Sequence, residues 1–297
     1  MRSIRVGFCA AVIAAAGVAV AACGSAGPTG SAANPANPTT PSSPAANSPI
    51  KAIDAAYTST TSAGTAKISV DASISGAQTQ GAGFTVAASG VMDFPHKTGD
   101  LTMSLMGMDL EMRYLDGVQY MHAPSAMLAK DGGKPWVKID LNELAKAKLG
   151  TSMGQLTSGT PTDPTQMLSY LRGMGTVTDK GPATIDGTPT EHYLAVMNVS
   201  DLVKKENLTA DQAAQIEKVL GGGQVPMQVW IDQQNRLRQL TYSQNMDLGA
   251  ITGNATGAGA GTVAIQETMK LSDFGVPVNV TMPPADQTAD ALNALGK

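Results

Sequence analysis

Apolar and polar residues alternate along much of the chain, and this period of two is the feature that most restricts its fold. The clearest run covers residues 66–74, where the even positions are Ala or branched apolar residues and the odd positions are Lys, Ser or Asp. In a strand, every second side chain points to the same face of the sheet. The run therefore predicts a strand with one face in the core and the other in water.

Hairpin signals separate several of these runs. Residues 98–105 and 109–115 flank Gly107, and their apolar positions change from odd to even numbers across it. Asp116-Gly117 is a strong two-residue turn signal that leads into residues 118–122. Strands joined in this way favour an antiparallel sheet. We expect nine or ten strands, which cover 66–74, 84–94, 98–105, 109–115, 118–122, 136–141, 190–199, 225–232, 237–246 and 262–271.

A few helices accompany the strands. Ser48-Pro49 and Asp163-Pro164 each provide a capping residue followed by proline at the first helical position, and Gln166 is placed for a capping box. Further helices are expected over 141–148 and from Thr209 to Gly221. No second linker follows residue 50, so we interpret residues 50–297 as one α+β domain.

The N-terminus predicts export and lipidation. Arg2 and Arg5 precede an apolar run over residues 6–22, which ends in Val20-Ala21-Ala22-Cys23. This is the pattern of a bacterial lipobox, so residues 1–22 are expected to be a lipoprotein signal peptide and Cys23 to carry diacylglycerol. The chain would then be anchored at the extracytoplasmic face of the bacterial cell membrane. A plain secretory signal is the alternative.

A tether is expected between the anchor and the domain. After Cys23, residues 24–49 contain only Gly, Ser, Ala, Pro, Thr and Asn, and six of these 26 residues are Pro. Such a composition cannot bury enough apolar surface to offset the entropy of ordering it. We therefore expect residues 23–49 to be a disordered, lipidated spacer.

Composition excludes several functions. The formal net charge is -4 and basic residues form no block, which argues against nucleic acid as a partner. Both cysteines, Cys9 and Cys23, lie in the N-terminal segment, so the domain has no thiol chemistry and no disulfide. The three histidines lack further ligands at metal spacing. Residues 150–154 match G-x-S-x-G without the strand and helix that a nucleophile elbow needs. We expect no catalytic residue, no metal and no cofactor.

Methionine is the most informative compositional bias. The chain has 16 methionines but only four Phe and two Trp. Methionines can simply fill gaps in a core that is short of aromatic residues. They can also form a compliant wall for ligands of irregular shape, such as acyl chains. The sequence leaves both interpretations open.

Four stretches of the second half carry a family resemblance. Residues 185–193, 225–232, 236–238 and 271–278 resemble the LppX/LprG-like lipoproteins, which are relatives of the LolA and LolB lipoprotein carriers. The resemblance implies a curved antiparallel half-barrel wrapped around a few α-helices, with an apolar cavity for lipid chains. It also implies a role as a lipid or glycolipid carrier, and an envelope transporter is a candidate partner. We expect a monomer.

Residues in apolar phase are the candidates for the wall of this cavity. They are Ile68, Val70, Leu110, Met112, Tyr114, Met227 and Val229 from strands, with Met167 and Leu171 from a helix. Two functional interpretations compete: a lipid-carrying lipoprotein, and an envelope sensor or accessory lipoprotein whose half-barrel is filled by its own side chains. An enzyme is a distant third.

Overall fold

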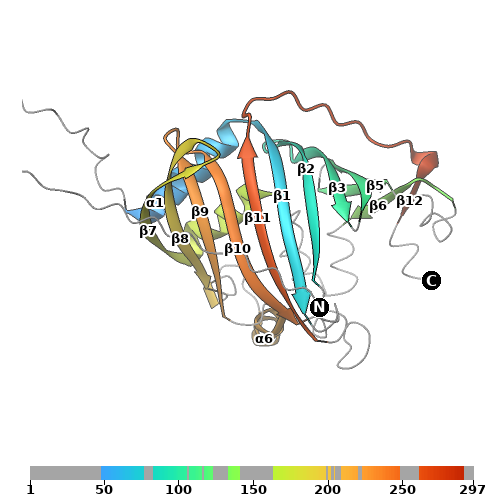
Figure 1. Ribbon diagram of the computed structural model, residues 1–297. Helices are drawn as coiled ribbons and strands as arrows, with labels where there is room; N and C mark the ends of the chain where they lie inside the picture. The colour runs from blue at the N-terminus through green and yellow to red at the C-terminus, as the bar shows by residue number, and fades with distance from the viewer. Residues whose placement is uncertain are drawn as a thin grey trace, which may run out of the picture. The chain divides into compact units, whose positions relative to one another are not determined.

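A computed structural model describes residues 48–76, 83–105, 107–115, 117–122, 133–140, 163–198, 200–201, 204, 209–219, 223–247 and 261–290. All of them lie in one compact unit, Pro44–Lys297. Its centre is a single curved sheet, accompanied by the helices α1, α4 and α6 (Figure 1).

The sheet has twelve strands in its described part. In chain order they are β1 (Thr65–Gly76), β2 (Phe84–Asp93), β3 (Thr98–Leu105), β4 (Met108–Leu115), β5 (Val118–His122), β6 (Trp136–Asp140), β7 (Gly175–Ile185), β8 (Thr188–Asn198), β9 (Gln224–Asp232), β10 (Leu237–Asp247), β11 (Thr262–Ser272) and β12 (Thr288–Asp290). The helices are α1 (Pro49–Ser62), α4 (Pro164–Met174), α6 (Ala210–Val219) and the short 3-10 helix η3 (Ala285–Gln287).

The spatial order is β12-β6-β5-β4-β3-β2-β1-β11-β10-β9-β8-β7, so the sheet is open, with β12 and β7 at its edges. Of the neighbouring pairs, only β12 and β6 run parallel. The predicted fold class, an α+β half-barrel with a curved antiparallel sheet, is confirmed. The predicted count of nine or ten strands is too low, because neither β7 nor β12 shows a clear apolar alternation in the sequence. The helix expected over 141–148 lies outside the described residues.

The two prolines begin their helices as predicted. Pro49 and Pro164 occupy the first turns of α1 and α4. The side chain of Asp163 accepts hydrogen bonds from the backbone N–H of Thr165 at 2.9 Å and of Gln166 at 3.4 Å. The Nε2 group of Gln166 donates a hydrogen bond to the hydroxyl of Tyr170 at 3.0 Å. Helix α4 packs on α1 and β8.

Helix α1 also contacts the sheet directly. Ile53 and Ala56 are fully buried on one of its faces, and α1 packs against β7 and β10. The buried hydroxyl of Thr60 accepts a hydrogen bond from the backbone N–H of Leu237 at 2.9 Å. That bond satisfies a donor at the irregularity in the pairing of β10 with β9. Both α1 and α4 therefore cover the same face of the sheet.

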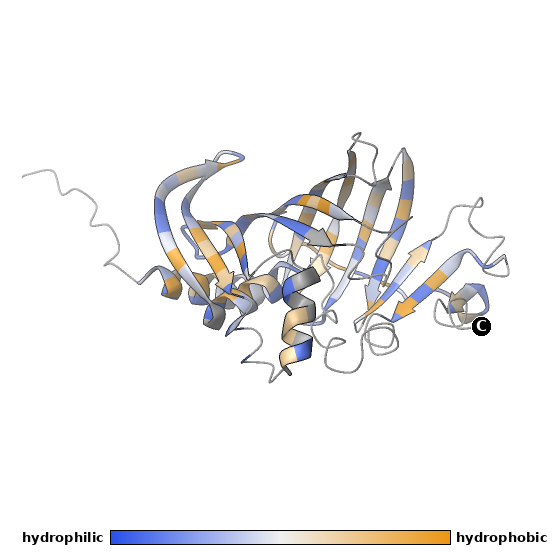
Figure 2. Cartoon of the chain, turned by 90° about the horizontal axis from the view of Figure 1, so that it is seen from below, coloured by the Kyte–Doolittle hydropathy of each residue, from blue (hydrophilic) through white to orange (hydrophobic). Residues whose placement is uncertain are grey.

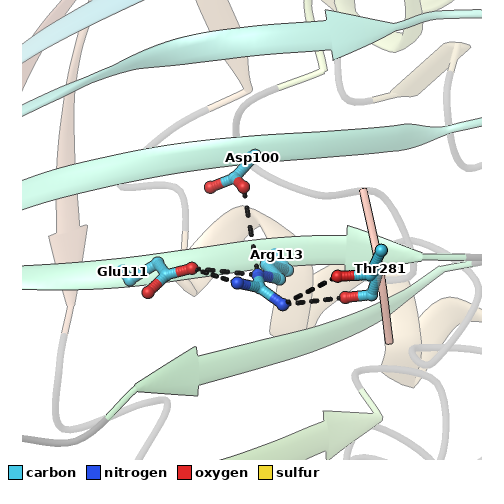
Figure 3. A network of polar contacts seen from close by, with 4 residues as sticks. All are labelled: Asp100, Glu111, Arg113 and Thr281. Atoms are coloured by element: carbon cyan, nitrogen blue, oxygen red, sulfur yellow. Dashed lines mark hydrogen bonds and ion pairs between the residues drawn. The ribbon is translucent and has the colours of Figure 1, made fainter. Parts of the chain in front are cut away.

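The segment after β11 runs across the sheet to its far edge as a strap, defined here as residues 273–290 (Figure 1). It begins on β1, where the N–H of Gly275 donates to the carbonyl of Thr65 at 2.8 Å. It continues past Arg113, which donates to the carbonyl of Thr281 at 2.9 Å (Figure 3). It ends as β12, which pairs with β6. The strap therefore connects the middle of the sheet to one edge.

Candidate functional site

The sheet face that meets α1 and α4, called the inner face here, is apolar in continuous rows. One row starts at Leu110 on β4 and crosses six further strands through Met103, Ala88, Val70, Met269, Leu240 and Val229. Each residue is the register partner of the next, so their side chains are neighbours on one face. Figure 2 shows the corresponding alternation of hydropathy along the strands. The apolar positions predicted from the alternation thus lie together on one face of the sheet.

The structure places the predicted wall residues on this inner face or on the helix that meets it. Relative exposures are 2% for Ile68, 7% for Val70, 4% for Leu110, 4% for Met112, 3% for Tyr114, 0% for Leu171, 1% for Met227 and 0% for Val229. Met167 is partly buried and packs against the same core cluster, to which all the others except Leu110 belong. The nine residues therefore lie on the inner face or on α4, and eight of them are buried.

Methionines are spread over the whole core cluster. Those buried in it are Met92, Met112, Met197, Met227 and Met269, and those packed against it are Met103, Met121 and Met167. Met112 and Met121 are register partners on β4 and β5. Unbranched, polarizable thioether side chains adapt to irregular shapes. The inner face is thus compliant as well as apolar.

Burial of the inner face changes along the central strands. Near the start of β1, Ala66, Ile68 and Val70 are buried, as are Met269 and Leu271 opposite them on β11. Toward the other end, side chains in the same phase are partly exposed. They are Ala72, Ile74, Phe84, Val86, Gln244 and Ile265. The first part of the inner face is called closed here and the second accessible, although Val263 at the far end of β11 is also buried, with 4% exposure.

A polar pair lies between the closed and the accessible part. Glu267 on β11 and Tyr242 on β10 are register partners with exposures of 9% and 8%. The Tyr242 hydroxyl donates a hydrogen bond to Oε2 of Glu267 at 2.9 Å. Burial raises the pKa of the Glu267 carboxyl, an effect that this hydrogen bond partly opposes. Burial, together with the Glu267 charge and hydrogen bond, raises the pKa of Tyr242.

This pair was not predicted from the sequence, although the sequence contains a signal for Glu267. Val263, Ile265, Met269 and Leu271 occupy the inward phase of β11, and Glu267 is the charged residue among them. A charged residue in apolar phase is rarely fully buried without a partner. That exception to the alternation could have marked the position.

The outer face of the sheet is polar by comparison. Two open hollows of about 380 Å³ and 370 Å³ lie on it, lined mainly by outward residues of β1, β2 and β11 such as Lys67, Ser69 and Thr85. Near the β12 edge of the sheet, Cζ of Arg113 lies 4.7 Å from the centroid of the Trp136 ring. Nη2 of Arg113 donates a hydrogen bond to Oε1 of Glu111 at 2.6 Å. These contacts fix the strap and the edge strands rather than a ligand site.

The described residues contain neither a candidate metal cluster nor a helix that could span a membrane. No group of three or more His, Cys, Asp and Glu side chains there could hold a metal ion. No helix in that part of the chain has the length and apolar character needed to cross a membrane. Cys23 and the G-x-S-x-G string at 150–154 lie outside the described residues.

Comparison with known proteins gives distant relatives. No family model matches the chain. An uncharacterized 31.2 kDa protein from the rplA-rplJ intergenic region of Streptomyces griseus is 28% identical over 188 residues, which are 61% of this chain and 56% of that protein. A protein of Streptomyces coelicolor that is named as a candidate lipoprotein is 23% identical over 181 residues, 61% of this chain and 51% of that protein. The chain spans about half the length of these curated relatives.

Among solved structures, the lipoprotein LppX of Mycobacterium tuberculosis matches with 16% identity and a TM-score of 0.47, covering 78% of this chain and 98% of LppX. LprF of Mycobacterium bovis matches with 12% identity and a TM-score of 0.37, covering 79% and 96%. A LolA superfamily protein of Nitrosomonas europaea matches with 9% identity and a TM-score of 0.27, covering 78% and 96%. LppX and the LolA superfamily are also the groups that residues 185–193, 225–232, 236–238 and 271–278 resemble, and all three matches have TM-scores below 0.5.

Proposed function

We propose that this protein is a membrane-anchored lipoprotein that binds the acyl chains of a lipid or glycolipid on its inner face and carries them within the cell envelope. The observation that carries this proposal is the continuous apolar inner face, which is buried near the start of β1 and partly exposed toward the other end of β1 and β2. An acyl chain entering from the accessible end would meet apolar side chains across several strands.

The energetics favour such a ligand. Each methylene moved from water into apolar surroundings contributes about 0.8 kcal/mol, so a chain of ordinary length gains enough to offset the entropy of its ordering. Methionines allow the wall to adapt to chains of different length and branching. No charge on the ligand is needed for this gain, and we propose binding rather than catalysis as the activity.

The N-terminal segment supplies the anchor in this proposal. Diacylglycerol on Cys23 would hold the chain at the extracytoplasmic face of the cell membrane, and residues 24–49 would act as the spacer to the domain 50–297. Two acyl chains give stable anchoring where a single chain binds only marginally. A tether of this composition has a reach of roughly 25–30 Å as a flexible coil, which would let the domain approach a lipid source or an envelope transporter.

Native mass spectrometry tests the binding proposal. The chain from residue 24 to 297, which contains the whole compact unit, is exported behind a cleavable secretory signal and purified without detergent. We expect a mass increment that is lost after organic extraction and that recurs in the extract as an acyl lipid. A single mass equal to that of the bare polypeptide, unchanged after incubation with acyl lipids, would contradict it.

The alternative is a lipoprotein that carries no lipid and serves as a sensor or accessory subunit. The low exposure of eight of the nine candidate wall residues favours it, since none exceeds 7%. In that case the inner face is filled by its own side chains. The Met112→Trp experiment in the Discussion separates the two, because added bulk has opposite effects in a void and in a close-packed core.

A further inference from the structure

We propose that the free carboxyl oxygen of Glu267 is a polar anchoring point for the bound lipid, and that it binds a hydroxyl group of the ligand at the boundary between the closed and the accessible parts of the inner face. This inference rests on the proposed function, because it assigns a specific contact to the lipid that the inner face is proposed to hold. It adds a preference for hydroxylated lipids that acyl-chain binding alone does not require.

The first observation is an orphaned acceptor. Oε2 of Glu267 accepts the hydroxyl hydrogen of Tyr242, whereas Oε1 is buried and has no hydrogen-bond partner in the described part of the chain. A buried polar atom left without a partner costs free energy comparable to a lost hydrogen bond. A ligand hydroxyl at Oε1 would remove that cost.

The second observation is the position of the pair. Glu267 faces Ala72 on β1, and Tyr242 faces Met227 on β9. Two residues further along each strand toward the closed end, Val70, Met269 and Leu240 are buried. One step toward the accessible end, Ile265 and Gln244 are partly exposed. An acyl chain bound to the closed part of the inner face would bring an adjacent polar group of the same lipid to the level of Glu267.

The chemistry of the pair selects a hydroxyl group. A carboxyl oxygen accepts a hydrogen bond from a hydroxyl in either protonation state, and a protonated carboxyl can also donate one. An ionised carboxylate would repel a phosphate group. Since Tyr242 already holds Oε2, the orientation of Oε1 is fixed before the ligand arrives, which reduces the entropic cost of the contact. The hydroxyl can belong to a glycerol or sugar head group, or it can lie on the acyl chain itself.

Three lipids of equal chain length test the anchor by displacing a fluorescent acyl probe from residues 24–297. Methyl stearate has no hydroxyl, 1-monostearoylglycerol has hydroxyls in its head group, and methyl 12-hydroxystearate has one on the chain. We expect wild type to prefer at least one hydroxylated lipid over methyl stearate by roughly tenfold. The preferred lipid then identifies the head group or the chain as the source of the hydroxyl.

Variants at Glu267 assign the preference to its carboxyl. Glu267→Met keeps a similar side-chain length without polar atoms, and it should lose the preference while still binding methyl stearate. Glu267→Gln keeps hydrogen-bonding atoms at the same place and should retain most of it. Glu267→Ala replaces the methionine variant if melting curves show that the latter does not fold.

The outcomes separate the two proposals. Equal affinity of wild type for all three lipids, or a preference that persists in Glu267→Met and Glu267→Ala, overturns the anchor while leaving acyl-chain binding intact. Failure of wild type to bind any of the three lipids overturns the proposed function and the anchor with it.

Discussion

Replacing Met112 by Trp distinguishes an open inner face from a filled one. Met112 lies in the middle of β4 with 4% exposure and has Leu101 and Met121 as register partners on its two sides. Its thioether accepts a hydrogen bond from the Gln119 amide at 3.3 Å. A thioether is a weak acceptor, so losing this bond contributes little. The effect of the substitution therefore depends mainly on whether space exists beyond the side chain, away from the sheet.

The two cases differ enough in magnitude to be separated. If the indole enters space that a ligand would occupy, we expect the free energy of unfolding to change by less than about 1 kcal/mol and the fluorescent acyl probe to be excluded. If Met112 is in contact on all sides, overpacking should cost roughly 1–3 kcal/mol. For a domain of this size, 1 kcal/mol shifts Tm by about 2–4 °C, so the second case predicts a fall of roughly 2–12 °C.

The measurement combines a melting curve with retention of the acyl probe. Thr102→Trp is the matched control, since Thr102 is exposed on the outer phase of the neighbouring strand β3. The control should leave Tm and probe binding unchanged. A clear fall in the Tm of Met112→Trp, together with a wild type that never binds the probe, would refute the carrier interpretation and favour a filled half-barrel.

Three further predictions concern the anchor, the sheet and the buried carboxyl. Cys23→Ala should abolish metabolic labelling with palmitate, and unchanged labelling would show that Cys23 carries no lipid. Gly90→Ala should destabilise the domain, because a Cβ there would lie 2.0 Å from the carbonyl oxygen of Asp100; an unchanged Tm would refute the close approach of β2 and β3. Glu267→Gln should become more stable relative to wild type as pH rises above 4.5, as measured by unfolding at several pH values. The native pKa of Glu267 is raised from 4.5, so its contribution to stability is present below 4.5 and is lost as pH rises through the native pKa. A stability difference that does not vary with pH would contradict this assignment.

Much of the sheet could be predicted from local pattern. The alternation over 66–74 gives the inward phase of β1, and the turn at Gly107 gives the pairing of β3 with β4. These features depend on neighbours in sequence, so a short window contains the information. The pairing of β1 with β11 joins Ile68 to Leu271, and no local signal specifies such a distant partner. The seven strand residues predicted for the wall are buried because burial follows the same period of two, whereas Met167 and Leu171 lie on α4 and follow the helical period.

The polar pair on the inner face could not be predicted as a pair. Tyr242 and Glu267 lie on different strands, and their contact depends on the register between β10 and β11. Periodicity assigns each side chain to a face but does not fix which residues are opposite one another. Sequence alone therefore gave the apolar surface and missed the polar group within it.

The properties of edge strands explain why β7 and β12 were not predicted and how the sheet stays open. An unpaired edge invites aggregation unless it is blunted. Strand β7 contains Pro182, and its register with β8 shifts between Asp179 and Gly181. Both features suppress pairing with a further strand. They also interrupt the apolar alternation by which a strand is recognised in the sequence. At the other edge, β12 is only three residues long, and the strap brings it there through its contacts with Arg113 and β1. With both edges protected in this way, the sheet need not close into a barrel. The open sheet leaves its inner face to be covered by helices, and α1 and α4 pack on it from that side.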